Sequence, residues 1–280
     1  MEQLLRQYAI GGRVIGILSP EFEESEYLSP FRCEAAASDV LFCVNVGHPV
    51  LPADAVCQSR DLHTGCYTVE GKQIRVLFRE KTEDPLLLIS QSGAGTYEVC
   101  LEAACLPLWD SNLVMKMLDL PSLLLSFDAV FLHASFVVRE EKAILFTAPK
   151  QTGKSTQAAL WEQHRKAKIL NGDRALLRCV DGRWTAFGSP YCGTSRICEA
   201  GAYPIAAIVI LSQGKENAVR PTHAREAVAA FLDGCSYDPQ QNTEQILDLA
   251  LDIWQNVPVL HLCCLPDESA VACLENAILK

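Results

Sequence analysis

The sequence predicts an α/β fold of the α+β kind, with a β-rich N-terminal lobe followed by a mixed sheet with flanking helices. Three observations predict it. Short β-type runs fill the first 110 residues, a helical period begins near Ser111, and a strand, a loop and a helix follow one another around Gly153. We therefore expect two domains, residues 1–120 and 121–280.

The first lobe consists of short runs with strand composition, separated by clusters of Gly, Pro, Asp and Ser. Glu70-Gly71 has the composition of a hairpin turn. No catalytic motif occurs here, so we expect a structural lobe or one that recognises a substrate. The expected strands are Arg13–Leu18, Val40–Val46, Tyr67–Val69, Gln73–Phe78, Leu86–Ser90 and Tyr97–Leu101.

Between the lobes, the segment Ser111–Phe127 changes to a helical period. Pro121 lies inside it and should split or kink the helix, because proline lacks the N–H that the preceding turn needs. The apolar positions that set the period are Leu113, Met117, Leu120, Leu124 and Phe127.

The second lobe should alternate strands and helices. Asp181-Gly182 predicts a tight turn between two of the strands. The expected strands are Phe131–Val138, Ala143–Thr147, Lys168–Leu170, Ala175–Val180, Arg183–Phe187, Ala206–Leu211 and Pro258–Leu262, and the expected helices are Thr152–Arg165, Thr222–Leu232, Thr243–Asn256 and Asp267–Leu279.

Composition excludes several classes of partner. The chain has a formal net charge of -10 and lacks a basic stripe, so nucleic acid is not an expected partner. Its most apolar run, Leu118–Val138, is interrupted by Asp, Pro and His residues, so we expect no membrane span.

No export signal follows Met1, which favours a cytoplasmic location. The 13 cysteines include no CxxC pair and should be reduced, buried, structural thiols.

Residues 148–156, Ala-Pro-Lys-Gln-Thr-Gly-Lys-Ser-Thr, match a phosphate-binding loop except that Ala148 replaces the first glycine. Gly153 lets the backbone approach phosphates, Lys154 supplies a charge for the β- and γ-phosphates, and Ser155 offers a hydroxyl to Mg²⁺. We expect ATP with Mg²⁺ to bind here. The methyl group of Ala148 is expected to strain a turn that prefers positive φ. The expected nucleotide-binding residues are Lys150, Gln151, Thr152, Gly153, Lys154, Ser155 and Thr156.

The alternative is that Gly-Lys-Ser stands by accident at a helix start. The apolar strand before the loop and the amphipathic helix after it favour a nucleotide loop. The strand before the loop is also unusual, because too few residues separate it from Phe131–Val138 for a crossover helix. These two strands must therefore pair antiparallel, unlike those of most phosphate-loop proteins.

With this hairpin, the sequence resembles the HPr-kinase-like and phosphoenolpyruvate-carboxykinase-like group of P-loop proteins, especially the stand-alone serine kinases related to HPr kinase. The resemblance spans about residues 125–279. It implies a phosphoenolpyruvate-carboxykinase-like core and ATP-dependent phosphoryl transfer to a hydroxyl. Several relatives lie beside peptide-maturation machinery. The segments that carry the resemblance are Leu132–Ser135, Ala143–Thr156, Ile169–Arg174 and Gly188–Gly193.

The resemblance implies roles for individual residues. Asp173 matches an acid that binds Mg²⁺ or takes the hydroxyl proton, although relatives commonly have two adjacent acids where this chain has Gly172 beside Asp173. His133 would orient or deprotonate the acceptor. Arg196, after the loop with Gly188, Pro190 and Gly193 that lines the acceptor side, would stabilise transferred charge. The ordinary alternatives are a turn aspartate, a core histidine and a surface ion pair.

The leading hypothesis is a kinase that transfers the γ-phosphate of ATP to a serine-type hydroxyl of a peptide or small protein. Two alternatives stay open. One is a non-catalytic nucleotide-binding module that regulates or carries a peptide, suggested by Ala148 and Gly172. The other is a kinase of small hydroxyl metabolites. A homo-oligomer is also an open alternative.

Overall fold

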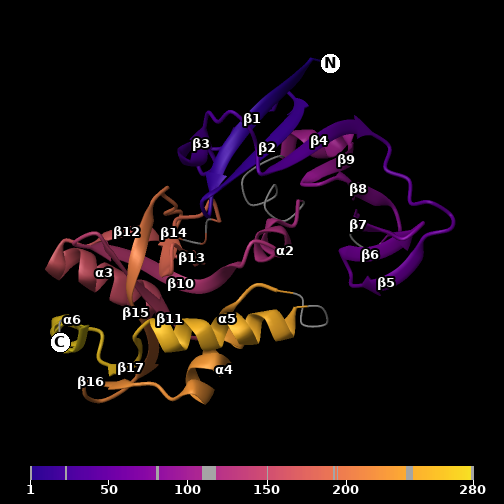
Figure 1. The fold of residues 1–280 in the computed structure, drawn as a ribbon. Coiled ribbons are helices and arrows are strands. Elements are labelled where there is room, and N and C mark those ends of the chain that lie inside the picture. Colours follow the sequence, from indigo (N-terminus) through magenta and orange to yellow (C-terminus); the bar gives the residue numbers. More distant parts are fainter. Residues whose placement is uncertain are drawn as a thin grey trace. The chain divides into compact units, whose positions relative to one another are not determined.

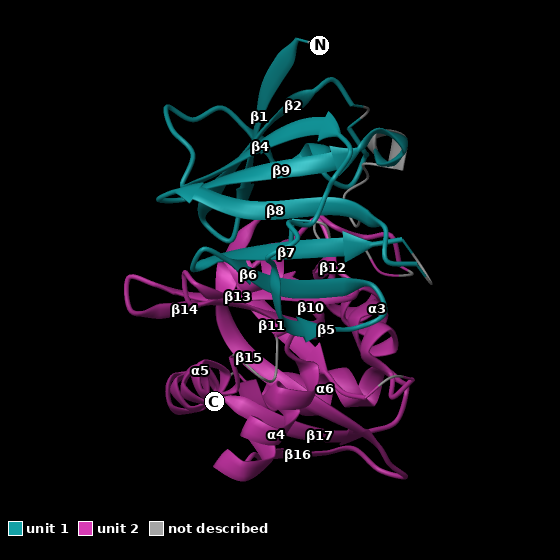
Figure 2. Ribbon diagram, turned by 90° about the vertical axis from the view of Figure 1, so that its right-hand side faces the viewer, with its two compact units in different colours: residues 1–119 teal, residues 120–280 magenta. Residues whose placement is uncertain are grey.

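A computed structural model describes residues 2–22, 24–79, 82–108, 118–149, 151–191, 193, 195–237 and 242–278 of the chain. The chain divides into two compact units, residues 1–119 and 120–280 (Figure 2). Each unit contains its own large sheet, and most helices belong to the second (Figure 1). The fold is thus a mixed α/β fold of the α+β kind.

Unit 1 is a nine-stranded sheet in the order β3-β1-β2-β4-β9-β8-β7-β6-β5. The β2–β4 and β4–β9 pairs are parallel, and the other neighbours are antiparallel. Its elements are β1 Gln3–Ile10, β2 Arg13–Pro20, the 3-10 turn η1 Ser29–Phe31, β3 Arg32–Cys33, β4 Val40–Gly47, β5 Val56–Arg60, β6 Thr64–Val69, β7 Lys72–Phe78, β8 Pro85–Gly93, β9 Thr96–Glu102 and the 3-10 turn η2 Ala103–Leu108.

Two tight turns set the register at the ends of this sheet. Gly11 and Gly12, with φ of 62° and 71°, join β1 to β2, and Glu70 and Gly71, with φ of 48° and 77°, join β6 to β7. Consecutive positive φ angles match the twist of antiparallel strands, and glycine adopts them without a steric penalty. The hairpin expected at Glu70-Gly71 is confirmed.

Unit 2 is an eight-stranded sheet in the order β11-β10-β13-β14-β15-β17-β16, with β12 also paired to β10 and β11 to β15. Its elements are α2 Leu120–Leu125, β10 Ala129–Arg139, β11 Lys142–Thr147, α3 Lys154–Arg165, β12 Lys168–Asn171, β13 Arg174–Val180, β14 Arg183–Phe187, β15 Ala202–Gln213, β16 Ala218–Pro221, α4 Ala224–Gly234, α5 Thr243–Asn256, β17 Val259–Cys264 and α6 Glu268–Ile278.

The long strand β10 connects the two halves of this sheet. Its first half, residues 129–133, pairs with β13, and its second half, residues 134–139, pairs with β11. Both pairings are antiparallel, so the hairpin expected before the phosphate loop is confirmed. The β11 strand also runs parallel to β15, and β15 runs parallel to β17. The carboxyl ends of these three strands therefore meet at one edge of the sheet.

Helices cover both faces of the sheet in unit 2. Phe231 of α4 and Ile253 of α5 belong to one buried cluster with Phe136 and Leu145, whereas Trp161 of α3 and Leu274 of α6 belong to a second cluster. Adjacent residues of β11 alternate between the clusters, as successive side chains of a strand must. This packing fixes α3, which follows the loop 148–153, against the sheet.

Some expectations need correction. In the described part of the segment 111–127, helix α2 covers Leu120–Leu125, and Pro121 lies in its first turn, which a split of the segment at Pro121 allows. That position tolerates proline, because first-turn amides have no intrahelical partner. Residues 109–117 lie outside the described part. The described cysteines are free, but only Cys66, Cys105 and Cys198 are buried. Among the described residues, no helix is both long and apolar enough to cross a bilayer.

Candidate phosphoryl-transfer site

The loop between β11 and α3 contains two residues with left-handed backbone conformations. Gln151 and Gly153 have positive φ, at 64° and 117°. Ala148 does not, so its methyl group imposes no left-handed strain, contrary to the sequence-based expectation. It packs on the core cluster around Phe146 instead. Lys150 lies outside the described residues.

Helix α3 begins after a glycine. Gly153 is the N-cap residue, and it forms no side-chain hydrogen bond with the first turn of the helix. A Cβ placed on Gly153 would meet no atom within 4 Å. Open space therefore adjoins a helix terminus whose partial positive charge favours phosphate.

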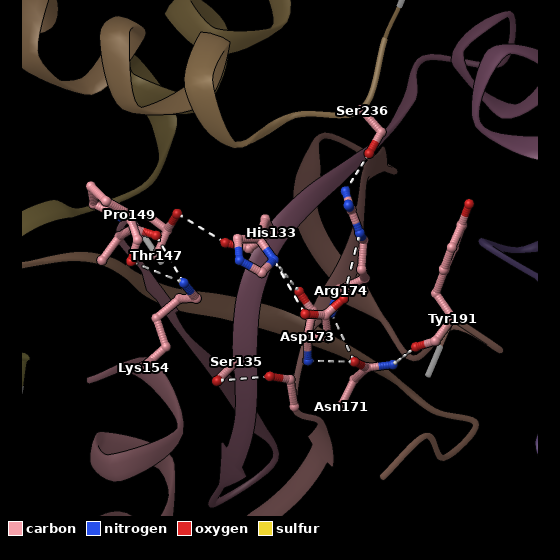
Figure 3. A network of polar contacts seen from close by, with 12 residues as sticks. His133, Ser135, Thr147, Pro149, Lys154, Asn171, Asp173, Arg174, Tyr191 and Ser236 are labelled. Atoms are coloured by element: carbon pink, nitrogen blue, oxygen red, sulfur yellow. Dashed lines mark hydrogen bonds and ion pairs between the residues drawn. The ribbon is translucent and has the colours of Figure 1, made fainter. Parts of the chain in front are cut away.

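Lys154 is nearly buried, with 9% exposure, and stays inside the loop. Its Nζ donates to the carbonyl oxygens of Ala148 at 2.8 Å and Pro149 at 3.4 Å (Figure 3). The ammonium group thus lies across the turn rather than in solvent. A charge held in this position would face phosphates that approach the loop amides.

The other loop residues hold the turn or expose hydroxyls. Thr152 donates from Oγ1 to the Pro149 carbonyl at 2.9 Å, and the Gln151 carbonyl accepts from Gln213 of β15 at 3.5 Å. Ser155 and Thr156 are exposed on the first turn of α3. Ser155 therefore has an accessible hydroxyl next to the loop, as a ligand to nucleotide-bound Mg²⁺ requires.

A buried asparagine shapes the turn that carries Asp173. Asn171 is 0% exposed, and its Oδ1 accepts from the amides of Asp173 and Arg174, both at 2.8 Å. Its Nδ2 donates to the carbonyls of Ser189 at 3.1 Å and Tyr191 at 2.8 Å. One side chain thus fixes the β12–β13 turn and ties it to the loop after β14.

His133 lies between the phosphate loop and Asp173 (Figure 3). Its Nδ1 is 3.0 Å from the Asp173 carbonyl oxygen and 3.4 Å from Oδ1 of the same residue. Because a carbonyl oxygen only accepts, Nδ1 carries the hydrogen and donates. Burial lowers the pKa of His133 from its ordinary value, and the charges of Lys154 and Arg174 lower it further, against the opposing effect of Asp173. The ring is therefore a neutral donor at neutral pH.

Three glycines allow the turn and the following loop to approach closely. A Cβ on Gly193 would lie 2.4 Å from the Cβ of Asp173, and a Cβ on Gly172 would lie 2.1 Å from the Oγ of Ser195. A Cβ on Gly188 would lie 1.8 Å from a backbone carbonyl oxygen. The second acid that the family resemblance implies at residue 172 therefore has no room here.

Arg196 follows this contact on an exposed stretch of the loop. It adopts a φ of 55°, and its amide donates to the Gly193 carbonyl at 3.1 Å. No ion pair of Arg196 occurs among the described residues. Cys192 and Thr194 lie outside them.

The candidate site thus gathers Lys154, His133 and Asp173 at one end of the sheet in unit 2, with Arg196 on the neighbouring loop. Sequence reasoning missed Asn171 and Arg174 as parts of it. The available signal was Asn171 itself, since an Asx turn places its side chain against the amides two and three residues on. No local pattern marked Tyr191 or Ser236.

The described residues contain no cluster of three or more His, Cys, Asp or Glu side chains suited to hold a metal alone. Magnesium in nucleotide sites needs fewer protein ligands, because phosphate oxygens and water supply the rest. Asp173, with a side chain 32% exposed, and the exposed Ser155 are chemically suited to that incomplete set.

Comparisons with solved structures find a structural likeness for about half of this chain. The chain is similar to the HPr(Ser) kinase/phosphatase from Coxiella burnetii, with a TM-score of 0.31 and 12% sequence identity. The similar region covers 53% of this chain and 92% of that chain. No protein-family description matches the sequence, and no curated protein matches it.

Proposed function

We propose that this protein is an ATP- and Mg²⁺-dependent kinase that phosphorylates a serine-type hydroxyl of a peptide or small protein. The observation that carries the proposal is the order of three side chains. Lys154, at the start of α3, lies on one side of His133, and Asp173 lies on the other side (Figure 3). A cation for phosphates and a carboxylate for the hydroxyl are the two groups that phosphoryl transfer requires.

Each residue has a role in this proposal. The loop amides and Lys154 hold the β- and γ-phosphates. Asp173 takes the proton of the acceptor hydroxyl, and the oxygen of that hydroxyl bonds to the γ-phosphorus. The bond between this phosphorus and the β–γ bridging oxygen breaks, and ADP is released. His133 holds Asp173 in place through its Nδ1–H. Mg²⁺, held by Asp173 and Ser155 with phosphate oxygens, would neutralise developing charge.

The first experiment measures nucleotide binding. Lys154→Met should weaken ATP affinity roughly 10–100-fold, since a charge-assisted hydrogen bond contributes about 1.5–3 kcal/mol. Lys142→Met is the matched control, because Lys142 is the exposed first residue of β11. Equal affinities of the two variants in a calorimetric titration would exclude the phosphate loop as the binding site.

The second experiment measures transfer. Wild-type protein, ATP, Mg²⁺ and serine peptides are incubated, and mass spectrometry detects the added phosphoryl group. Asp173→Asn should lower the rate roughly 10²–10⁴-fold, the range for loss of a general base. The control is Asp181→Asn at the tip of the β13–β14 hairpin. If both variants transfer phosphate equally, Asp173 is not the base.

A second candidate function is nucleotide binding without catalysis. The packing of Ser195 against Gly172 favours it, because the turn then carries one acid for both the metal and the proton. ATP binding that depends on Lys154, with no transfer to any peptide or free hydroxyl compound, would select this function over the kinase.

A further inference from the structure

We propose that Arg174 selects the acceptor by binding a carboxylate that lies next to the phosphorylated hydroxyl. This inference rests on the proposed function, because it assumes that the acceptor hydroxyl approaches Asp173. The carboxylate would belong either to an acidic residue beside the serine or to a serine at a free C-terminus. Both sources present the same group to the guanidinium.

The backbone of Arg174 is fixed directly beside Asp173. Its amide donates to Asn171 Oδ1 at 2.8 Å, and it opens strand β13 opposite His133 of β10. Both anchors are buried or partly buried, so the position of the guanidinium relative to the Asp173 carboxylate depends on the torsion angles of these two side chains.

Three groups then hold the guanidinium. Nη1 donates to the hydroxyl of Ser236, the ring of Tyr191 lies 5.6 Å from the guanidinium carbon, and Nε is 3.7 Å from Asp173 Oδ2 (Figure 3). Tyr191 is itself held by an edge contact with Phe131, with ring centroids 5.5 Å apart. A cation fixed this way keeps little of the rotamer freedom that binding would otherwise cost.

The guanidinium retains capacity for an anion. It has five N–H donors in a planar fork, and the distance of 3.7 Å to Asp173 is too long for a direct hydrogen bond. Its side chain is 28% exposed, so a ligand can reach it. A guanidinium with N–H donors left over can bind a ligand carboxylate through two parallel hydrogen bonds.

The location favours the acceptor rather than the nucleotide. Figure 3 shows Arg174, Tyr191 and Ser236 on the opposite side of His133 and Asp173 from Lys154. A carboxylate bound at Nε and a hydroxyl bound at Asp173 would be about 9 Å apart or less, since a hydrogen bond of about 2.8 Å at each end adds to the 3.7 Å between Nε and Oδ2. The residue that carries the hydroxyl, or a neighbouring residue, can place an anion within this distance.

The test compares three short peptides with one serine each. The first has glutamate beside the serine and an amidated C-terminus, the second has glutamine there, and the third ends in serine with a free carboxylate. Binding is measured by calorimetry with a non-hydrolysable ATP analogue, and transfer is measured with ATP. Wild-type protein should bind at least one carboxylate peptide roughly 10–100-fold more tightly than the glutamine peptide.

Arg174→Gln should remove this preference and raise KM for the preferred peptide by the same factor, with little change in kcat. Arg174→Lys should restore part of it, because lysine keeps the charge but not the fork. Ser236→Ala should weaken it less than Arg174→Gln does. Arg183→Gln, at the exposed start of β14, is the matched control and should change nothing.

The outcomes separate this inference from the proposed function. Equal binding of all three peptides to wild-type protein, or an equal fall in kcat for every peptide in Arg174→Gln, would overturn the role of Arg174 in selection. A carboxylate preference that Arg174→Gln removes, in a protein that transfers phosphate to no peptide, would support the selection site and overturn the kinase.

Discussion

Asn171 should contribute more to stability than any single exposed residue of unit 2, and replacing it tests the account of the site. Its amide is fully buried and takes part in four hydrogen bonds of 3.1 Å or less, two accepted from amides and two donated to carbonyls. Asn171→Ala removes all four and leaves their backbone partners without a replacement.

The expected cost follows from the number of bonds. Each contributes about 1 kcal/mol net, so losing four should lower the free energy of unfolding by about 4 kcal/mol. Asn171→Asp should be about as harmful, because it keeps the shape but turns a carboxylate oxygen toward the carbonyls of Ser189 and Tyr191. For a unit of this size, such a loss lowers Tm by about 8–16 °C.

Urea unfolding followed by tryptophan fluorescence measures the loss. Three of the four tryptophans, Trp161, Trp184 and Trp254, belong to unit 2, so most of the signal reports the unit that contains Asn171. Asn256→Ala is the control, since that side chain is exposed at the end of α5 and should change stability by no more than about 0.5 kcal/mol. A loss below about 1 kcal/mol for Asn171→Ala would refute the reasoning.

Three further predictions concern the same site. The pKa of His133 is lower in the folded protein than in the unfolded chain, so its contribution to stability is complete above the unfolded pKa and is lost as the pH falls through the folded pKa. His133→Asn should therefore reduce the fall of the free energy of unfolding at acidic pH, as measured by urea titrations. Gly193→Ala should displace the Asp173 carboxylate and lower kcat more than ATP affinity, which kinetics and calorimetry can separate. Gly188→Ala should destabilise by at least about 2 kcal/mol in thermal unfolding, whereas Gly47→Ala, whose added Cβ would meet one sulfur at 3.9 Å, should be nearly neutral.

Much of unit 2 could be predicted because its elements carry strong local signals. Helix α5 has the expected bounds, Thr243–Asn256, since its apolar residues repeat at helical spacing and fill one buried stripe. Strand β14 also has its expected bounds, because Asp181-Gly182 fixes one end. In both cases local chemistry and tertiary packing favour the same structure.

Strands with weak alternation were missed. Leu4 and Leu5 of β1 are both exposed, so its sequence lacks the alternation of a half-buried strand. The Gly11-Gly12 turn that pairs β1 with β2 was an available signal. The short strands β5 and β16 were also missed, and both lie at sheet edges where burial imposes little pattern.

The candidate site was predictable only where a motif is contiguous. Residues 151–156 follow from a local pattern and Asp173 follows from the family resemblance, and their roles stay predictions. The contact of Arg174 with Ser236 joins residues 62 positions apart, and Asn171 reaches Tyr191 across 20. Such partners depend on how separate elements pack, which periodicity along one segment does not encode.

The close approach of Gly172 and Ser195 constrains how the turn between β12 and β13 can evolve. A lineage that gained an aspartate at residue 172 first would push it into the Ser195 side chain. If Ser195→Gly occurred first, it would open this space. Gly172→Asp would then be tolerated after Ser195→Gly but would be destabilising before it. Epistasis of this kind would be measurable by comparing Gly172→Asp alone with the same change in a Ser195→Gly background.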